Sequence, residues 1–190
     1  MTADMERLAA AFSAVHRVDF LTKDERSNAE QDRPLFIGHG QTNSQPTTVK
    51  NMLTLLDPRP GDRVLDVGSG SGWTTALLGT LVTSTGRVFG VELVPELADW
   101  GRDNLAGYTM SWASIQQAEP DLLGLPEHAP YDRILVSAEA RELPGSLVDQ
   151  LGAGGRMVIP VAGRLSVVER DDGGRVDVRR VGHYAFVPLR

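Results

Sequence analysis

Three glycines at alternate positions, Gly68, Gly70 and Gly72, are the feature that most restricts how this chain can fold. They follow a largely apolar pentapeptide at 63–67 and precede an apolar decapeptide at 73–82, which predict a short buried strand and a helix. Because glycine has no Cβ, such a loop can turn tightly and let a ligand contact its backbone. A strand, a glycine loop and a helix in succession are typical of open α/β sheets, which bind ligands at the carboxyl ends of their strands.

Alternating strand and helix patterns continue through the rest of the chain. Strands are predicted at 87–92, 131–138 and 154–162, and helices at 95–105 and 144–151. Two extended stretches follow from residue 164, joined by the turn sequence DDGG at 171–174, which is a hairpin signal. These patterns predict an α/β fold with a doubly wound, mostly parallel sheet that ends in an antiparallel strand pair.

The N-terminal part of the chain has a different pattern. Apolar residues at helical spacing predict an amphipathic helix over 5–15. Residues 19–45 are mostly polar, with several turn formers, and predict a long irregular segment that leads into a helix near Pro46. A structureless stretch of that length is uncommon in a compact domain and is usually functional.

The composition argues against several classes of protein. The 190 residues carry a formal net charge of −6, and their scattered lysines and arginines do not form the basic stripe of a nucleic-acid-binding surface. There is no cysteine, which excludes disulfides and thiolate chemistry, and the four histidines lack metal-ligand spacing. No apolar run approaches the roughly 20 residues of a membrane span, and the N-terminus has no signal-peptide core. We therefore expect a cytoplasmic protein with no metal and no nucleic-acid or membrane partner.

The spacing of the glycines narrows the choice of ligand. A dinucleotide-binding loop, G-x-G-x-x-G, would need its third glycine at the position of Trp73, and a Walker loop would need a following Gly-Lys-Ser or Gly-Lys-Thr. Glu92 ends the next predicted strand, where a carboxylate can accept both hydroxyls of an adenosyl ribose. The alternative is that the glycines only form a tight turn and that Glu92 is a solvated carboxylate.

The G-x-G-x-G pattern preceded by Asp66 resembles motif I of the class I methyltransferases, which bind S-adenosylmethionine. Further segments resemble the protein-L-isoaspartate O-methyltransferase family in the same order and over nearly the whole chain. They lie at 32–46, 63–73, 91–105, 125–161 and 186–189. The resemblance implies transfer of a methyl group from S-adenosylmethionine to the α-carboxylate of L-isoaspartyl residues, which starts the repair of damaged proteins.

The same resemblance implies a Rossmann-like class I methyltransferase fold in a single domain, 1–190. Its first part, 1–62, would hold an N-terminal helix and the active-site segment, and 63–190 would form the cofactor-binding sheet and a C-terminal hairpin. Ser44 and Thr42 would be the active-site residues, in a segment lying over the methyl group of the cofactor. The cofactor-binding residues would be Gln41, Asp66, Gly68, Ser69, Gly70, Gly72, Glu92, Leu93, Glu119 and Asp121.

Some positions leave alternatives open. Ser44 precedes Gln45 and Pro46, so it is also a plausible helix N-cap. Trp73 is suited either to the cofactor pocket or to the core. Asn43 stands where the family commonly has Ile, and 119–121 replaces the Gly-Asp-Gly that the family has near the adenine.

Because of these departures from the family pattern, two other functions are alternatives. One is methylation of an ordinary aspartate or of a small carboxylic acid, and the other is cofactor binding without catalysis. An NAD-dependent oxidoreductase is disfavoured, because Trp73 occupies the third glycine position. The sequence does not determine the oligomeric state.

Overall fold

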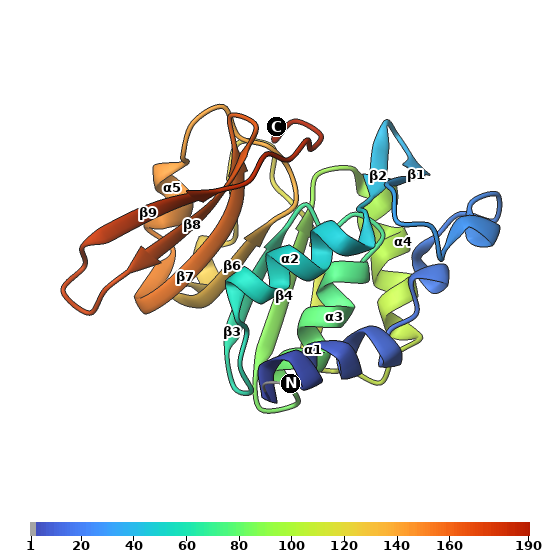
Figure 1. Ribbon diagram of the computed structural model, residues 1–190, viewed down its shortest axis with the longest axis horizontal. Coiled ribbons are helices and arrows are strands. Elements are labelled where there is room, and N and C mark those ends of the chain that lie inside the picture. The colour runs from blue at the N-terminus through green and yellow to red at the C-terminus, as the bar shows by residue number, and fades with distance from the viewer. Residues whose placement is uncertain (1–2) are drawn as a thin grey trace.

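The computed structural model describes residues 3–190, and its centre is a seven-stranded sheet in the order β5-β4-β3-β6-β7-β8-β9 (Figure 1). The first five strands in that order pair in parallel, and β8 runs antiparallel to both of its neighbours. The strands are β3 (Arg63–Val67), β4 (Arg87–Glu92), β5 (Ala113–Gln117), β6 (Tyr131–Val136), β7 (Leu151–Val161), β8 (Arg164–Arg170) and β9 (Val176–Val181). The predicted mostly parallel sheet with a terminal antiparallel pair is confirmed.

Both faces of β3, β4, β6 and β7 are covered, and these strands bury apolar side chains on both sides of the sheet. In β3, Val64 belongs to the apolar cluster on one face and Leu65 to the cluster on the other. Four helices cover the first face (Figure 1), namely α1 (Ala3–Ala14), α2 (Pro46–Leu56), α3 (Trp73–Val82) and α4 (Pro95–Ala106). On the second face lie the short helix α5 (Gly145–Val148) and the chain from 118 to 130. This arrangement explains why the strands read as continuous apolar runs.

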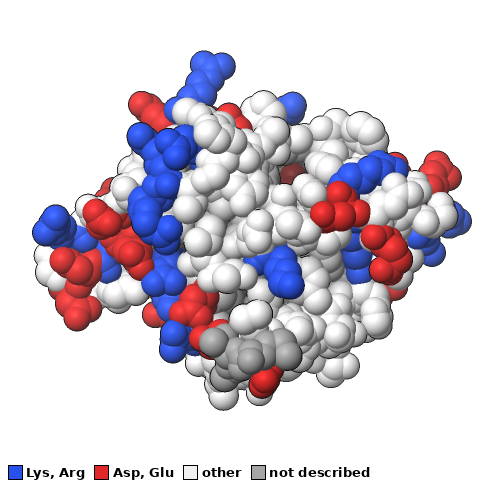
Figure 2. Space-filling model, in the orientation of Figure 1, with Lys and Arg blue, Asp and Glu red and all other residues white. Residues whose placement is uncertain are grey.

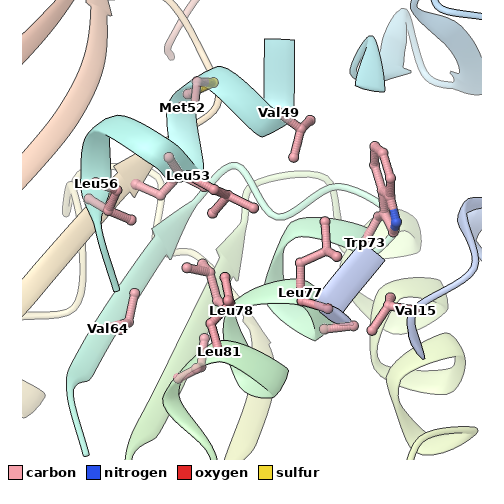
Figure 3. Packing of buried hydrophobic residues seen from close by; sticks show 14 of the residues in the cluster. Val15, Val49, Met52, Leu53, Leu56, Val64, Trp73, Leu77, Leu78 and Leu81 are labelled. Atoms are coloured by element: carbon pink, nitrogen blue, oxygen red, sulfur yellow. The ribbon is translucent and has the colours of Figure 1, made fainter. Parts of the chain in front are cut away.

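The helix α3, which follows the glycine loop, packs against α1 and β4 and shares an apolar cluster with α2. Figure 3 shows Leu53 of α2 and Leu78 of α3 pointing into the same space above β3. Both side chains are fully buried, and burial of each is worth about 1.5–3 kcal/mol. Buried apolar contacts therefore hold α3 on the sheet, and its N-terminal end lies where β3 ends.

The segment predicted to be irregular contains a two-stranded hairpin, which corrects the prediction for 35–43. Here β1 (Leu35–Gly38) pairs with β2 (Gln41–Asn43), after two short 3-10 helices, η1 (Arg17–Phe20) and η2 (Arg26–Asn28). Leu35 and Ile37 are buried while Phe36 is exposed. An alternation over so few residues, among turn formers, is too short to separate from irregular chain.

The strand β5 was also missed, because only Ile115 of its five residues is buried and the others are mostly polar. It is the edge strand next to β4, so one side of it has no partner strand. Other differences are in bounds: the strand predicted at 131–138 ends at Val136, the helix predicted at 144–151 is the four-residue α5, and β7 begins before 154. A further 3-10 helix, η3 (Pro126–His128), precedes β6.

Charged side chains on the face shown in Figure 2 gather at its left and right edges, where basic and acidic groups lie side by side. The middle of that face, over α2 and α3, is mostly uncharged. Among residues 3–190, no helix is both long and apolar enough to cross a membrane.

Candidate active site

The glycine loop leaves the end of β3 in conformations that favour glycine. Gly68 has a φ of +77° and Gly72 a φ of +97°, both in the left-handed region. A Cβ on Gly72 would lie 2.9 Å from the carbonyl oxygen of Gly101 and 3.0 Å from Cδ1 of Ile115. The absence of a side chain at Gly72 therefore lets the loop pack directly on α4.

Asp66 lies beneath the loop and is fully buried. Its Oδ2 accepts hydrogen bonds of 2.7 Å from the hydroxyls of both Thr74 and Thr75, in the first turn of α3. Burial raises the pKa of Asp66 to about 6, although the two hydroxyl bonds act in the opposite direction. The carboxyl group thus joins the end of β3 to the start of α3 across the glycine loop.

The raised pKa predicts how Asp66 affects stability. A carboxyl whose pKa is higher in the folded state stabilises the fold most below its unfolded pKa of about 3.9, and this contribution is lost as the pH rises through about 6. Relative to Asp66→Asn, the wild-type free energy of unfolding should therefore fall by roughly 2 kcal/mol between pH 4 and pH 7. Urea unfolding of both proteins across this range measures the difference, and a pH-independent difference would contradict the burial argument.

Glu92 ends β4 and faces the same loop. Its Oε2 accepts a hydrogen bond from the backbone N–H of Gly70 and its Oε1 accepts one from that of Val94, each at 2.9 Å. The side chain is 7% exposed, so the interpretation of Glu92 as a solvated carboxylate is wrong. Two backbone donors fix the carboxylate, while its remaining lone pairs are free to accept further hydrogen bonds.

The active-site segment, residues 41–45, leads directly into α2. Asp32, further back in the chain, binds the residues at this junction. The carboxylate of Asp32 accepts from the backbone N–H and the hydroxyl of Thr47, at 2.9 and 2.8 Å, and from the amide of Gln45 at 3.0 Å. These bonds, the backbone one foremost, lower the pKa of Asp32. The N-cap position belongs to Gln45 and shows no side-chain cap bond, so the N-cap interpretation of Ser44 is wrong.

A cavity of about 520 Å³ opens at the carboxyl ends of the parallel strands, and most of the predicted site residues line it. Its lining includes Gln41, Thr42, Ser44, Gly68, Ser69, Gly70, Glu92, Leu93, Glu119 and Asp121. The predicted residues Asp66 and Gly72 do not line it, because both lie beneath the loop surface. Trp73 fulfils both interpretations, since it lines the cavity and also belongs to the core cluster.

Two further segments of the cavity wall were not predicted from the sequence, residues 140–145 after β6 and residues 187–190. The backbone N–H of Glu139 donates to the carbonyl of Val187, and that of Leu189 donates to the carbonyl of Glu139, both at 2.8 Å. The family-like sequence at 186–189 signalled the second segment without indicating its place. Asn43, which departs from the family pattern, also lines the cavity.

Three buried side-chain polar atoms of the described residues have no hydrogen-bond partner, and all of them lie at the glycine loop. They are Oδ1 of Asp66, Oγ of Ser69 and Nε1 of Trp73. A buried polar atom without a partner is costly, and in a native structure it calls for an explanation such as a ligand. The three atoms offer one anionic acceptor and two donors.

The parallel sheet, the G-x-G-x-G loop and the strand-end acid together define a class I methyltransferase. A family model described as protein-L-isoaspartate(D-aspartate) O-methyltransferase (PCMT) matches residues 2–190. A protein-L-isoaspartate O-methyltransferase from Aeropyrum pernix is 48% identical over 190 residues, which cover 96% of this chain and 72% of that protein. The chain therefore belongs to the PCMT family.

Solved structures agree with this assignment at the level of the fold. One protein-L-isoaspartate O-methyltransferase matches with a TM-score of 0.87 at 24% identity, over 97% of this chain and 61% of that one. A candidate enzyme of the same name from Plasmodium falciparum, in complex with S-adenosyl-L-homocysteine, matches with a TM-score of 0.83 at 25% identity, over 97% and 90% of the two chains.

Proposed function

We propose that this protein is an S-adenosylmethionine-dependent carboxyl methyltransferase that methylates the α-carboxylate of L-isoaspartyl residues in damaged proteins. The observation that carries the proposal is the single cavity lined both by the glycine loop with Glu92 and by Thr42 with Ser44. This arrangement would bring a cofactor site and an acceptor site together. Membership of the PCMT family supports the choice of acceptor. The absence of cysteine favours a cytoplasmic location.

The residues at the glycine loop fit the methionine end of S-adenosylmethionine. Ser69 and Trp73 line the cavity, and their unpartnered hydroxyl and indole N–H suit the carboxylate of the methionine end. Asp66 lies beneath the loop and would support this end of the site through Thr74 and Thr75. Glu92 would accept the ribose hydroxyls. Leu93, Glu119 and Asp121 also line the cavity and would contact the adenine.

The work of the protein in this reaction is to position the reactants. When bound, S-adenosylmethionine supplies an electrophilic methyl group. A carboxylate has an ordinary pKa of about 3.9 and is already ionised at neutral pH, so no residue has to remove a proton. Ser44 and Thr42 would orient the acceptor carboxylate by donating hydrogen bonds, and the apolar cavity wall would exclude water. Positioning of this kind can contribute on the order of 7–11 kcal/mol to lowering the barrier.

Replacing Ser44 with alanine should slow turnover without weakening cofactor binding. The variant loses one hydrogen bond to a charged group, worth about 1.5–3 kcal/mol, so kcat should fall by about 10- to 100-fold. Calorimetry with S-adenosylhomocysteine should give an affinity within about twofold of the wild type. Ser114→Ala, on the edge strand β5, is the matched control and should leave both quantities unchanged. Weaker cofactor binding with an unchanged kcat would instead assign Ser44 to the cofactor site.

The reaction type is tested by incubating the purified protein with methyl-labelled S-adenosylmethionine and an isoaspartyl peptide. A carboxyl methyl ester is cleaved by mild alkali, so the label should be released as methanol. Label that resists alkali would indicate transfer to another kind of atom. Measurable cofactor binding with no transfer to any tested carboxylate would indicate a binding protein without catalysis.

A further inference from the structure

Arg17 is a buried arginine whose hydrogen bonds go to neutral oxygens. It lies at the start of η1, is 7% exposed, and has no carboxylate within ion-pair distance among the described residues. Its Nη1 donates to the carbonyls of Ala29 and Gln31 at 3.2 and 2.9 Å, and its Nη2 donates to that of Arg33 at 2.8 Å. The guanidinium therefore binds three backbone carbonyls of the segment that precedes the β1–β2 hairpin.

The same guanidinium holds the active-site segment. Nε donates to the side-chain oxygen Oδ1 of Asn43 at 2.8 Å, and Nη2 donates to the backbone carbonyls of Asn43 and Ser44 at 3.2 and 3.0 Å. Asn43 lies between Thr42 and Ser44 in the chain, and all three line the cavity. Any shift of the guanidinium would therefore shift the two residues assigned to the acceptor carboxylate.

Asn43 extends this network to the glycine loop. It is 5% exposed, and its Nδ2 donates to the hydroxyl oxygen of Ser71 at 3.4 Å. The guanidinium carbon of Arg17 also lies 5.4 Å from the ring centre of Trp73, the first residue of α3. Arg17 thus contacts both sides of the cavity, the active-site segment through Asn43 and Ser44, and the glycine loop through Trp73 and the Asn43 bridge.

We propose that Arg17 and Asn43 are positioning residues that set the active-site segment against the cofactor loop, with Asn43 as the bridge. The proposal rests on the proposed function for its catalytic readout. It explains why a polar residue stands at position 43: an apolar side chain there would leave Nε of Arg17 without its buried acceptor, and such unpaired groups are costly. Arginine suits the position, because its planar fork donates in several directions at once, whereas lysine does not.

The test compares Asn43→Leu with Asn43→Asp. Leucine removes the acceptor for Arg17 and the donor to Ser71, so kcat with an isoaspartyl peptide should fall by about 10- to 100-fold, while the KM for S-adenosylmethionine changes by less than about threefold. Aspartate still accepts from Nε of Arg17 and can accept from the Ser71 hydroxyl, so it should recover most of the lost kcat. Arg17→Lys should resemble Asn43→Leu. Asn51→Leu, the same change at an exposed position of α2, is the control and should keep wild-type kinetics.

A second readout separates this inference from the proposed function. Hydrogen exchange of residues 41–45 should slow on addition of S-adenosylhomocysteine in the wild type and in Asn43→Asp, but not in Asn43→Leu. This measurement holds whatever the acceptor is, so it can succeed even if isoaspartyl peptides are not methylated. Wild-type kcat and wild-type exchange in Asn43→Leu would overturn the inference. Equal losses of kcat in Asn43→Leu and Asn43→Asp, each in proportion to the fall in Tm, would also overturn the inference. Arg17 and Asn43 would then contribute to folding alone.

Discussion

Replacing Glu92 with alanine is expected to raise the Kd for S-adenosylmethionine by about 100-fold or more. The carboxylate is nearly buried and held by the backbone N–H groups of Gly70 and Val94, so it is already in place before a ligand arrives. Hydrogen bonds to a charged acceptor are worth about 1.5–3 kcal/mol each, and two ribose hydroxyls would lose such a bond. The loop also loses the acceptor for Gly70, which adds to the effect.

The measurement is titration calorimetry with S-adenosylmethionine on the wild type, Glu92→Ala and Glu92→Gln. The glutamine variant keeps one acceptor oxygen and should fall between the other two. Glu96→Ala, which removes an exposed acid in the first turn of α4, is the matched control and should bind like the wild type. Equal affinities in the wild type and in Glu92→Ala would refute the assignment of Glu92 to the ribose.

Gly72→Ala is expected to lower the free energy of unfolding by about 2–4 kcal/mol, with a fall in Tm of roughly 5–15 °C. Alanine is strained at a φ of +97°, and its Cβ would lie 2.9 Å from the Gly101 carbonyl oxygen and 3.0 Å from Ile115. The backbone carbonyl belongs to α4 and cannot move alone, so the loop or the helix must shift. Cofactor affinity should fall as well, because the same loop lines the cavity.

Urea unfolding and calorimetry measure both effects in one set of proteins. Gly145→Ala is the matched control for stability, because a Cβ there meets no atom within 4 Å and its φ is not in the left-handed region. That variant should unfold within about 0.5 kcal/mol of the wild type. Wild-type stability in Gly72→Ala would show that the loop accepts a side chain, and would contradict its close packing on α4.

The central sheet could be predicted from the sequence because local pattern and burial agree there. The runs at 63–67 and 87–92 are apolar on both faces, and the glycines between strand and helix require a tight turn. The edge strand at 113–117 could not be predicted in this way, because it buries only one residue and therefore has no apolar pattern. The hairpin at 35–43 was hidden for a similar reason, since two strands of four and three residues carry too little periodicity.

The candidate site could be predicted in part. Residues adjacent in the chain to the glycine loop or the strand end were found, because chain order determines their place at the carboxyl ends of the strands. Arg17 could not be found, since its role depends on five carbonyl groups brought together only by the fold. The contact of Asp121 with adenine and the division of the chain at 62 stay predictions.

The choice of acceptor is tested most directly with two peptides that differ only in one residue, L-isoaspartate or L-aspartate. Each is incubated with the purified protein and labelled S-adenosylmethionine, and the initial rate of methyl ester formation is measured. We predict methylation of the isoaspartyl peptide and none of the aspartyl peptide. Equal rates on both peptides, or methylation of the aspartyl peptide alone, would contradict it.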